Sequence, residues 1–228
     1  MNSQVVLSHR DVSHLDRFLL DEQGLLKVVP AAVYAALDWE ELRLWCHLRA
    51  FYGLPTTELV EYLRTLIGNW TVIEVGAGHG ALGRALGIPR TDNCCQTWPE
   101  VQLLYALQGQ PTIRYPADVE PLDALTAIQK YRPQVVLGSW VTQTSDGSRS
   151  GCMFGIDEEE VLRRVDTYVV FGSCTSHGGD KKAINRFRPE IIQEPWMWSR
   201  AKPGDAALFI WHQKRAQVWP QRRSTGIP

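Results

Sequence analysis

The most informative part of the sequence is the run Val72-Ile73-Glu74-Val75-Gly76-Ala77-Gly78-His79-Gly80-Ala81-Leu82-Gly83. A short apolar segment containing one acid leads into glycines at alternate positions, and a helical pattern begins at Ala81. Glycines permit positive φ and let the backbone approach a ligand, while the N-terminus of the following helix offers free N–H groups. A strand, a glycine turn and a helix in this order are typical of a nucleotide-cofactor site.

The glycine spacing with Ala81 also fits the dinucleotide fingerprint, so the glycines alone do not identify the cofactor. Glu74 helps to distinguish a dinucleotide site from other nucleotide sites. A carboxylate near the end of a buried strand is costly unless it meets a cation or strong donors, so we expect Glu74 to face a ligand. The alternative is an edge strand that leaves Glu74 in water. A nicotinamide oxidoreductase is disfavoured by Glu74 and by Asp92, which lies only 16 residues after Gly76.

Composition limits the class of protein. The 228 residues suffice for one α/β core and an accessory segment, and 24 basic residues nearly balance 25 acidic ones, so no global charge would gather nucleic acid. No apolar run reaches membrane-spanning length and no secretory signal opens the chain. The five cysteines have no metal-ligand spacing, which predicts reduced thiols, no metal site and a cytoplasmic location.

The N-terminal part of the chain is predicted to be helical. Asp38 can cap one helix, with Glu41 completing a capping box, and Thr56 begins a second helix that ends at Gly68. We expect these helices to pack on the core, and covering the cofactor cleft or the acceptor is the alternative. The predicted organisation therefore has three parts: a helical segment (1–68), a cofactor-binding α/β domain (69–212) and a basic, loosely held tail (213–228).

Further strands alternate with helices after the glycine turn. We expect them at residues 88–93, 111–115, 134–141 and 167–172, followed by a final antiparallel pair at 190–192 and 206–211. Helices between them are predicted to begin at Thr97, where Glu100 completes a capping box, and at Asp157. This alternation predicts a mostly parallel, right-handedly connected sheet whose last strand is antiparallel.

Ligands of such sheets bind beyond the carboxyl ends of the strands. The polar residues at the predicted strand ends should therefore converge on one cleft: Glu74, Asp92, Asp118, Ser139 and Trp140. Residues 142–156 are polar and contain three glycines, so we expect a mobile loop beside that cleft.

From Trp70 to about Trp211, these residues resemble the class I S-adenosylmethionine (SAM)-dependent methyltransferase superfamily. The resemblance rests on the Glu74, Gly76, Gly78 and Gly80 motif and on the spaced acids at strand ends. More narrowly, the chain resembles a set of phage and prophage methyltransferase-like proteins, through residues 86–93, 131–136, 139–142 and 153–158. The resemblance implies a Rossmann-like class I methyltransferase sheet that binds SAM and S-adenosylhomocysteine, and it leaves the acceptor open.

The resemblance also implies a role for each cofactor-binding residue. Glu74 holds the methionine amino end, the glycine loop passes beneath the sulfonium, and Asp92 takes the ribose hydroxyls. Asp118 contacts the exocyclic amine of the adenine. The complete set of implied cofactor contacts is Glu74, Gly76, Ala77, Gly78, Gly80, Asp92, Asn93, Asp118, Val119, Ser139 and Trp140. Each acid could instead be a loop cap or a solvated surface charge.

Two acceptor types are disfavoured because the motifs that bind them are not found at the end of the fourth predicted strand. Residues 138–141 read Gly-Ser-Trp-Val, which is not the Asn/Asp-Pro-Pro-aromatic tetrad that grips an adenine amino group. No Pro-Cys nucleophile follows, which disfavours covalent cytosine C5 methylation. The segment 196–200 could stack an aromatic acceptor or fill the core. The predicted function is SAM-dependent methyl transfer to an oxygen or nitrogen acceptor. The alternative is a catalytically silent methyltransferase-fold module for binding or assembly, for example in a phage particle.

His177 is the candidate catalytic base, because it follows the fifth predicted strand beside two glycines and titrates near neutrality. A solvated loop histidine is the alternative. A local basic patch suited to a phosphate or an acidic partner, or simply a solvated face, is formed by Lys181, Lys182, Arg186 and Arg188.

Overall fold

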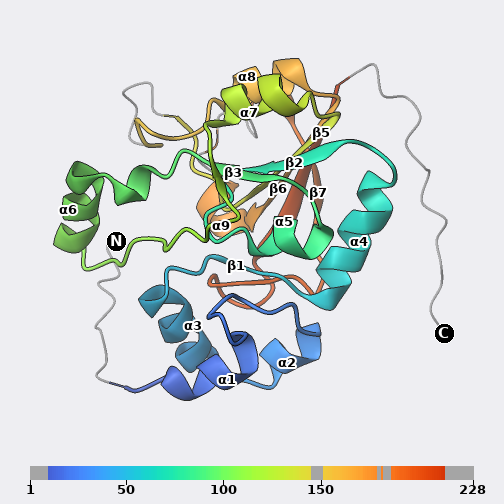
Figure 1. The fold of residues 1–228 in the computed structure, drawn as a ribbon. Helices are drawn as coiled ribbons and strands as arrows, with labels where there is room; N and C mark the ends of the chain where they lie inside the picture. Colours follow the sequence, from blue (N-terminus) through green and yellow to red (C-terminus); the bar gives the residue numbers. More distant parts are fainter. Residues whose placement is uncertain (1–9, 145–150, 179–180, 182–185, 214–228) are drawn as a thin grey trace, which may run out of the picture.

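The computed structural model describes residues 10–144, 151–178, 181 and 186–213. Its centre is a seven-stranded sheet with the order β4-β3-β2-β5-β6-β9-β7 (Figure 1). The strands are Val72–Val75 (β2), Arg90–Asp92 (β3), Glu120–Pro121 (β4), Val135–Ser139 (β5), Thr167–Ser173 (β6), Glu190–Ile192 (β7) and Ala206–His212 (β9). Only β9 runs against the others, so the predicted Rossmann-like sheet, mostly parallel with an antiparallel last strand, is confirmed.

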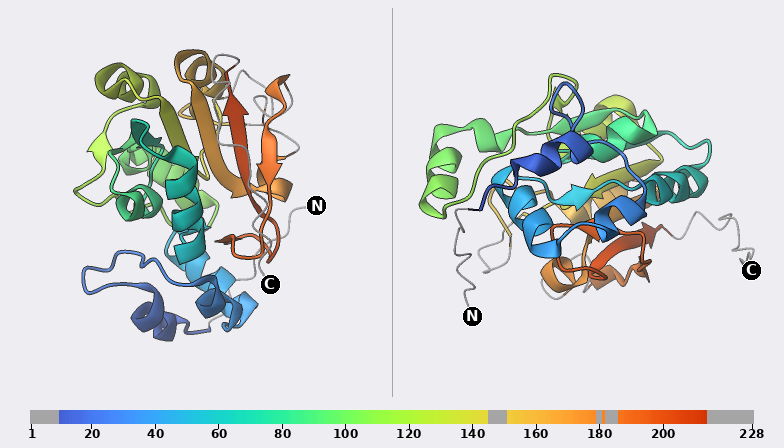
Figure 2. Two further views of the ribbon diagram at one scale, coloured as in Figure 1. Left: turned by 90° about the vertical axis from the view of Figure 1, so that its right-hand side faces the viewer. Right: turned by 90° about the horizontal axis from the view of Figure 1, so that it is seen from below.

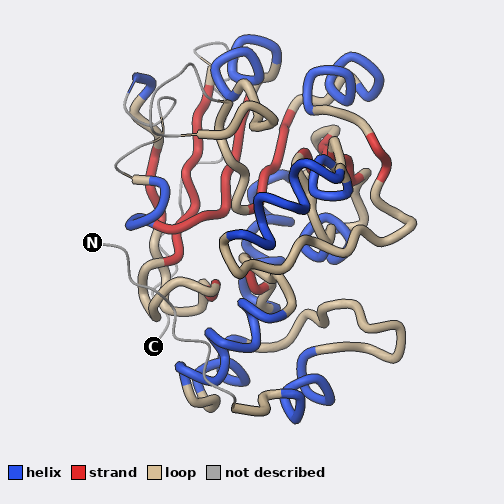
Figure 3. Tube along the Cα trace, turned by 90° about the vertical axis from the view of Figure 1, so that its left-hand side faces the viewer, coloured by secondary structure: helices blue, strands red, loops and turns tan. Residues whose placement is uncertain are grey.

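Helices cover both faces of this sheet (Figure 3). Thr57–Ile67 (α4) and Ala81–Leu86 (α5) pack on one face, and Ala124–Tyr131 (α7) and Glu158–Arg164 (α8) on the other. Two further helices are Pro99–Leu107 (α6), which projects away from the sheet (Figure 1), and Cys174–His177 (α9), which directly follows β6. Alternate residues of β6 divide between the two faces: Tyr168 packs with α7 and α8, and Phe171 with α4 and α5. Because both faces are covered, the strands are apolar on both sides, as parallel strands usually are.

The described part of the predicted helical segment that precedes α4, residues 10–56, has a hydrophobic cluster of its own and lies at one end of the molecule (Figure 2). Its elements are Ser13–Leu15 (η1), Asp16–Leu19 (α1), Ala31–Ala35 (α2), Trp39–Leu48 (α3) and Gly53–Leu54 (β1). Both predicted helix starts are confirmed, since Asp38 accepts from the Glu41 N–H (2.9 Å) and Thr56 from the Leu59 N–H (3.0 Å). The prediction of helix alone missed β1, which pairs antiparallel with Trp198–Ser199 (β8).

The third strand was predicted in the wrong place. Residues 111–115 form no strand, and the position beside β3 is taken by β4. Pro111 has no N–H for a ladder, and the N–H of Ile113 donates to the side chain of Gln96 (2.8 Å). Asp118 therefore precedes its strand instead of following it.

The predicted capping box at Thr97 is also wrong. Trp98 is the N-cap of α6 and Pro99 is its first residue, while the Thr97 hydroxyl donates to the Cys94 carbonyl (2.8 Å). Proline suits the first helical position because its φ is fixed and the N–H of that position has no helical partner. The helix consequently starts later than the Thr-Glu spacing indicates.

Two predicted segments lie partly or wholly outside the described residues: 145–150 within the loop at 142–156, and 214–228 of the basic tail. Among the helices of the described ranges, none combines the length and apolar character needed to cross a membrane.

Candidate functional site

A cavity of about 540 Å³ opens at the carboxyl ends of β2, β3 and β5. Cavities of a few hundred cubic ångströms are typical of small-molecule sites. Most of the predicted cofactor contacts line it: Glu74, Gly76, Ala77, Gly78, Asp92, Asn93, Ser139 and Trp140. Gly80, Asp118, Val119 and His177 are not among the lining residues.

Glu74 is fully buried in the middle of the sheet, between β3 and β5. The alternative of an edge strand with Glu74 in water is therefore wrong. Its Oε2 accepts a hydrogen bond from the Gly83 N–H (2.9 Å), while the buried Oε1 has no partner among the described residues. Burial raises the pKa of Glu74 to about 8, because the low-polarity surroundings disfavour the charged form.

The glycine loop is held to the end of β3 by Asp92. The Gly78 N–H donates to Oδ2 of Asp92 (2.9 Å), and the Cys94 N–H donates to Oδ1 (2.8 Å). Gly78 has a φ of 55°, and a Cβ there would lie 3.2 Å from Ile113 Cδ1, so a side chain would be both strained and crowded. Burial raises the pKa of Asp92. Asp92 thus caps a turn and lines the cavity at once.

The remaining predicted contacts differ in position. Asn93 joins the cavity wall through Nδ2, which donates to the Phe154 carbonyl (3.0 Å). Val119 is buried beside Gly80, outside the lining residues. Asp118 is held by Arg84 (2.7 Å) and Arg90 (3.3 Å), and the hydrogen bond from Arg84 lowers the pKa of Asp118.

Near Asp118, the acid that lines the cavity is Asp123, which the sequence analysis did not identify. It follows β4 and caps α7 by accepting from the Leu125 and Thr126 N–H groups (both 3.0 Å). An acid after a strand and before a helix was the available signal. It was overlooked because the third strand was placed too early.

Trp140 follows β5 with a φ of 56°, in the left-handed region that side chains other than glycine rarely adopt. Its N–H donates to the Phe171 carbonyl (2.8 Å), and its buried Nε1 has no partner in the described part of the chain. Backbone strain of this kind clusters at functional sites. Trp140 is thus held in a costly conformation at the edge of the cavity.

His177 stands behind Trp140, with the two ring centroids 5.0 Å apart and the planes nearly perpendicular. It is 7% exposed, and its Nδ1 accepts from the Ser173 N–H (2.9 Å), so the interpretation as a solvated loop histidine is wrong. Burial, with a smaller contribution from the charge of Lys181, lowers the pKa of His177 to about 4. The imidazole is therefore neutral at physiological pH.

The alternative that the N-terminal segment covers the cofactor cleft is supported by two residues at the end of its predicted helical pattern. Phe51 and Tyr52 line the cavity, and Arg200, beyond β8, lies against Tyr52. The His79 ring lies 4.3 Å from that of Phe51, and burial lowers the pKa of His79 to about 4. The segment therefore forms one wall of the cavity.

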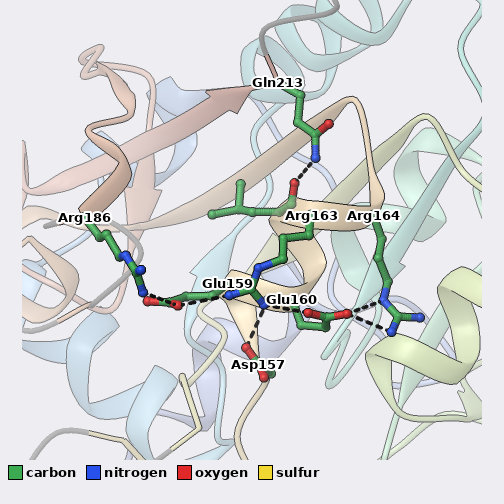
Figure 4. Close-up of polar contacts among 8 residues, drawn as sticks. Asp157, Glu159, Glu160, Arg163, Arg164, Arg186 and Gln213 are labelled. Carbon is green, nitrogen blue, oxygen red and sulfur yellow. Dashed lines mark hydrogen bonds and ion pairs between the residues drawn. The ribbon is translucent and has the colours of Figure 1, made fainter.

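Two residues of the predicted basic patch are paired with acids, whereas Arg188 is exposed. Lys181 is buried and donates to both carboxylate oxygens of Glu158 (2.7 and 2.8 Å). Arg186 pairs with Glu159 (2.8 Å) on the outer side of α8, as Figure 4 shows. Lys182 lies outside the described residues.

Comparisons with known proteins give only distant likenesses. No family model and no curated protein matches the chain. An rRNA methylase from Streptococcus thermophilus is 9% identical over 68% of this chain and 93% of its own, with a TM-score of 0.35. A candidate RNA methyltransferase from Pyrococcus horikoshii is 11% identical over 82% of this chain and 96% of its own, with a TM-score of 0.35. Likenesses this weak carry no argument about activity, and the phage resemblance stays a prediction.

Proposed function

We propose that the protein is a SAM-dependent methyltransferase and that SAM binds in the cavity at the ends of β2, β3 and β5. The observation that carries this proposal is the unpartnered Oε1 of Glu74, buried in the cavity wall. A buried carboxyl oxygen without a donor costs about 1–3 kcal/mol, which the ammonium of a bound ligand would offset. SAM carries such an ammonium on its methionine end.

The other lining residues also fit a nucleoside with cationic groups. Asp92 has the position at the second strand end from which a carboxylate would accept from both ribose hydroxyls. Asp123 is better situated than Asp118 to accept from an adenine amine, because Asp123 lines the cavity and Asp118 does not. Glycine at position 78 leaves the backbone accessible to a ligand.

SAM bound there would supply an electrophilic methyl group to an acceptor oxygen or nitrogen, with S-adenosylhomocysteine as the leaving group and a proton lost from the acceptor. The chain's contribution would be orientation of the two reactants and exclusion of water. A catalytic role for His177 stays a prediction, since His177 touches Trp140 and does not line the cavity. Replacement His177→Ala should lower turnover while leaving S-adenosylhomocysteine affinity nearly unchanged.

Calorimetry with S-adenosylhomocysteine and adenosine tests the proposal. The variant Asp92→Ala should bind both ligands about 5- to 150-fold more weakly, because charge-assisted hydrogen bonds to the ribose are lost. The matched control Asp118→Asn, an acid outside the cavity, should bind both as the wild type does. Wild-type protein that gives no binding heat with either ligand would contradict the proposal. Binding without any turnover of SAM would instead favour the catalytically silent module.

A further inference from the structure

The cavity has two sides with different chemistry. The sheet order puts β3, with Asp92 at its end, and β5, followed by Trp140, on opposite sides of β2. On the Trp140 side, the guanidinium carbon of Arg200 lies 3.9 Å from the ring centroid of Tyr52 and 5.7 Å from that of Trp140. The Tyr52 and Trp140 rings are themselves 5.9 Å apart. These three side chains form a compact aromatic and cationic wall.

We propose that the wall of Tyr52, Trp140 and Arg200 is the methyl-acceptor subsite and that it takes a small aromatic substrate bearing a carboxylate. This inference rests on the proposed function, because it assigns the Asp92 side of the cavity to SAM. The nucleophile would be a ring hydroxyl or amino group of the same substrate.

The guanidinium of Arg200 supports an anionic substrate group at this wall. Arg200 is the only lysine or arginine among the described lining residues, which also include the acids Glu74, Asp92, Asp123 and Asp157. Arg200 makes no ion pair with any carboxylate in the described ranges, although most arginines of the α8 surface do (Figure 4). A guanidinium presents its N–H groups in a planar fork that matches a carboxylate.

The aromatic residues support a planar substrate. Aromatic faces bind flat rings through offset or edge contacts, and Arg200 is already held against two of them. The backbone of Trp140 lies in the left-handed region, and the His177 ring packs edge-on against the Trp140 ring. His177 is thus a positioning residue for Trp140 in this proposal.

The pairing of β1 with β8 assembles this wall from distant parts of the chain. Gly53 pairs with Ser199, so the neighbouring residues Tyr52 and Arg200 meet, and the Arg200 N–H donates to the Tyr52 carbonyl (2.8 Å). A Cβ at Gly53 would lie 2.8 Å from the Ser139 hydroxyl oxygen and 3.0 Å from Cε1 of the buried Phe171 ring, so glycine favours the close approach of β1 to the end of β5. The N-terminal segment therefore completes the subsite.

Calorimetry and tryptophan fluorescence test the inference with hydroxybenzoates and aminobenzoates, each paired with its uncharged amide, in the presence of saturating S-adenosylhomocysteine. Wild-type protein should bind at least one acid and bind the matching amide at least about 10-fold more weakly. Arg200→Met should lower acid affinity by about 10- to 100-fold and leave amide affinity unchanged. The control Arg17→Met removes an arginine that also lies over a ring, that of Phe18, but on the surface, and should change nothing.

Three results would overturn the inference. Wild-type protein could bind S-adenosylhomocysteine but none of the acids, or Arg200→Met could bind the acids as the wild type does. Arg200→Met could also lose affinity for S-adenosylhomocysteine but keep it for 5′-methylthioadenosine, which lacks the amino-acid portion; Arg200 would then hold the methionine carboxylate. Unchanged S-adenosylhomocysteine affinity in Arg200→Met shows that the cavity is intact. Failure of the wild type to bind S-adenosylhomocysteine, with acid binding through Arg200 retained, would contradict the proposed function alone.

Discussion

Two buried glutamates in this protein have opposite surroundings. Glu158, on α8, is 3% exposed, and its carboxylate accepts from Lys181 through both oxygens and from the Tyr168 hydroxyl (2.9 Å). Glu74, on β2, is fully buried and accepts only from the Gly83 N–H among the described residues, which leaves Oε1 without a donor. The hydrogen-bonding needs of Glu158 are met within the protein, while Oε1 of Glu74 is left available to a donor on a bound ligand.

Burial alone therefore does not identify a binding residue. A buried charge is tolerated when the fold provides a counter-ion and donors, as around Glu158. A carboxyl group that is buried, half-partnered and in a cavity wall is a much stronger indication of a ligand. The acids on the outer side of α8 form a third class: Glu159 and Glu160 pair with surface arginines (Figure 4), and such pairs contribute little.

The largest effect is expected from removing the counter-ion of Glu158. Lys181→Met would leave a buried carboxylate with only the Tyr168 hydroxyl, which should lower the free energy of unfolding by about 3–5 kcal/mol. Urea denaturation measures the loss. The double variant Glu158→Gln, Lys181→Met should recover most of it, because no unpaired charge remains. A loss under about 1 kcal/mol in the single variant would mean that water reaches Glu158.

The next-largest effect is expected on the pH dependence of the free energy of unfolding, to which Glu74 should contribute. Its pKa is about 8 in the folded protein against 4.5 ordinarily, so the folded state holds a proton that the unfolded state releases between these values. The free energy of unfolding should therefore fall as the pH rises from 5 to 8, by up to about 1.4 kcal/mol per pH unit. Glu74→Gln cannot titrate and should gain stability relative to the wild type over this range. Denaturation curves of the two proteins that shift in parallel with pH would contradict the assignment.

Ligand affinity should also distinguish Glu74 from a glutamate outside the cavity. Glu74→Gln should weaken S-adenosylhomocysteine about 10- to 150-fold, because an ammonium bound beside Glu74 would favour its ionised form and glutamine cannot ionise, while adenosine affinity stays largely intact. Glu160→Gln, a control in the surface network of α8, should change neither affinity. Equal losses for adenosine and S-adenosylhomocysteine in Glu74→Gln would move Glu74 away from the methionine end. Calorimetry on circular-dichroism-verified variants provides the comparison.

Local patterns were sufficient to predict the central part of the fold. The apolar runs around Glu74, Val136 and Val170 predicted buried parallel strands, and Asp157 correctly predicted the start of α8 by capping it at the Glu160 N–H. The third strand escaped prediction because Glu120–Pro121 is too short to carry a periodic pattern, while the apolar Ile113 nearby suggested a strand that its backbone does not form.

The cavity was predictable where its residues lie near the carboxyl end of a predicted strand. Glu74, Asp92 and Trp140 lie at or near such strand ends and line one cavity, as expected. Tyr52 and Arg200 meet through a pair of two-residue strands, a contact that no periodicity in the sequence announces. His177 was expected near a turn because of its glycines, yet the ring is buried against Trp140, a tertiary contact with no local signature.

The smallest effect is expected at Tyr168, whose hydroxyl donates to Oε1 of Glu158. Tyr168→Phe keeps the buried ring and removes one hydrogen bond, but Oε1 retains its bond from Lys181. The loss should therefore be about 1 kcal/mol in the free energy of unfolding, with S-adenosylhomocysteine affinity unchanged. The contrast with Lys181→Met is informative, because both variants act on the same carboxylate and only one leaves its charge uncompensated. If Tyr168→Phe lowered the free energy of unfolding as much as Lys181→Met does, each donor to Glu158 would matter equally. The loss in Lys181→Met could then not be attributed to an uncompensated charge. If ligand affinity fell instead, Glu158 would be coupled to the cavity, and the distinction between the two glutamates would fail.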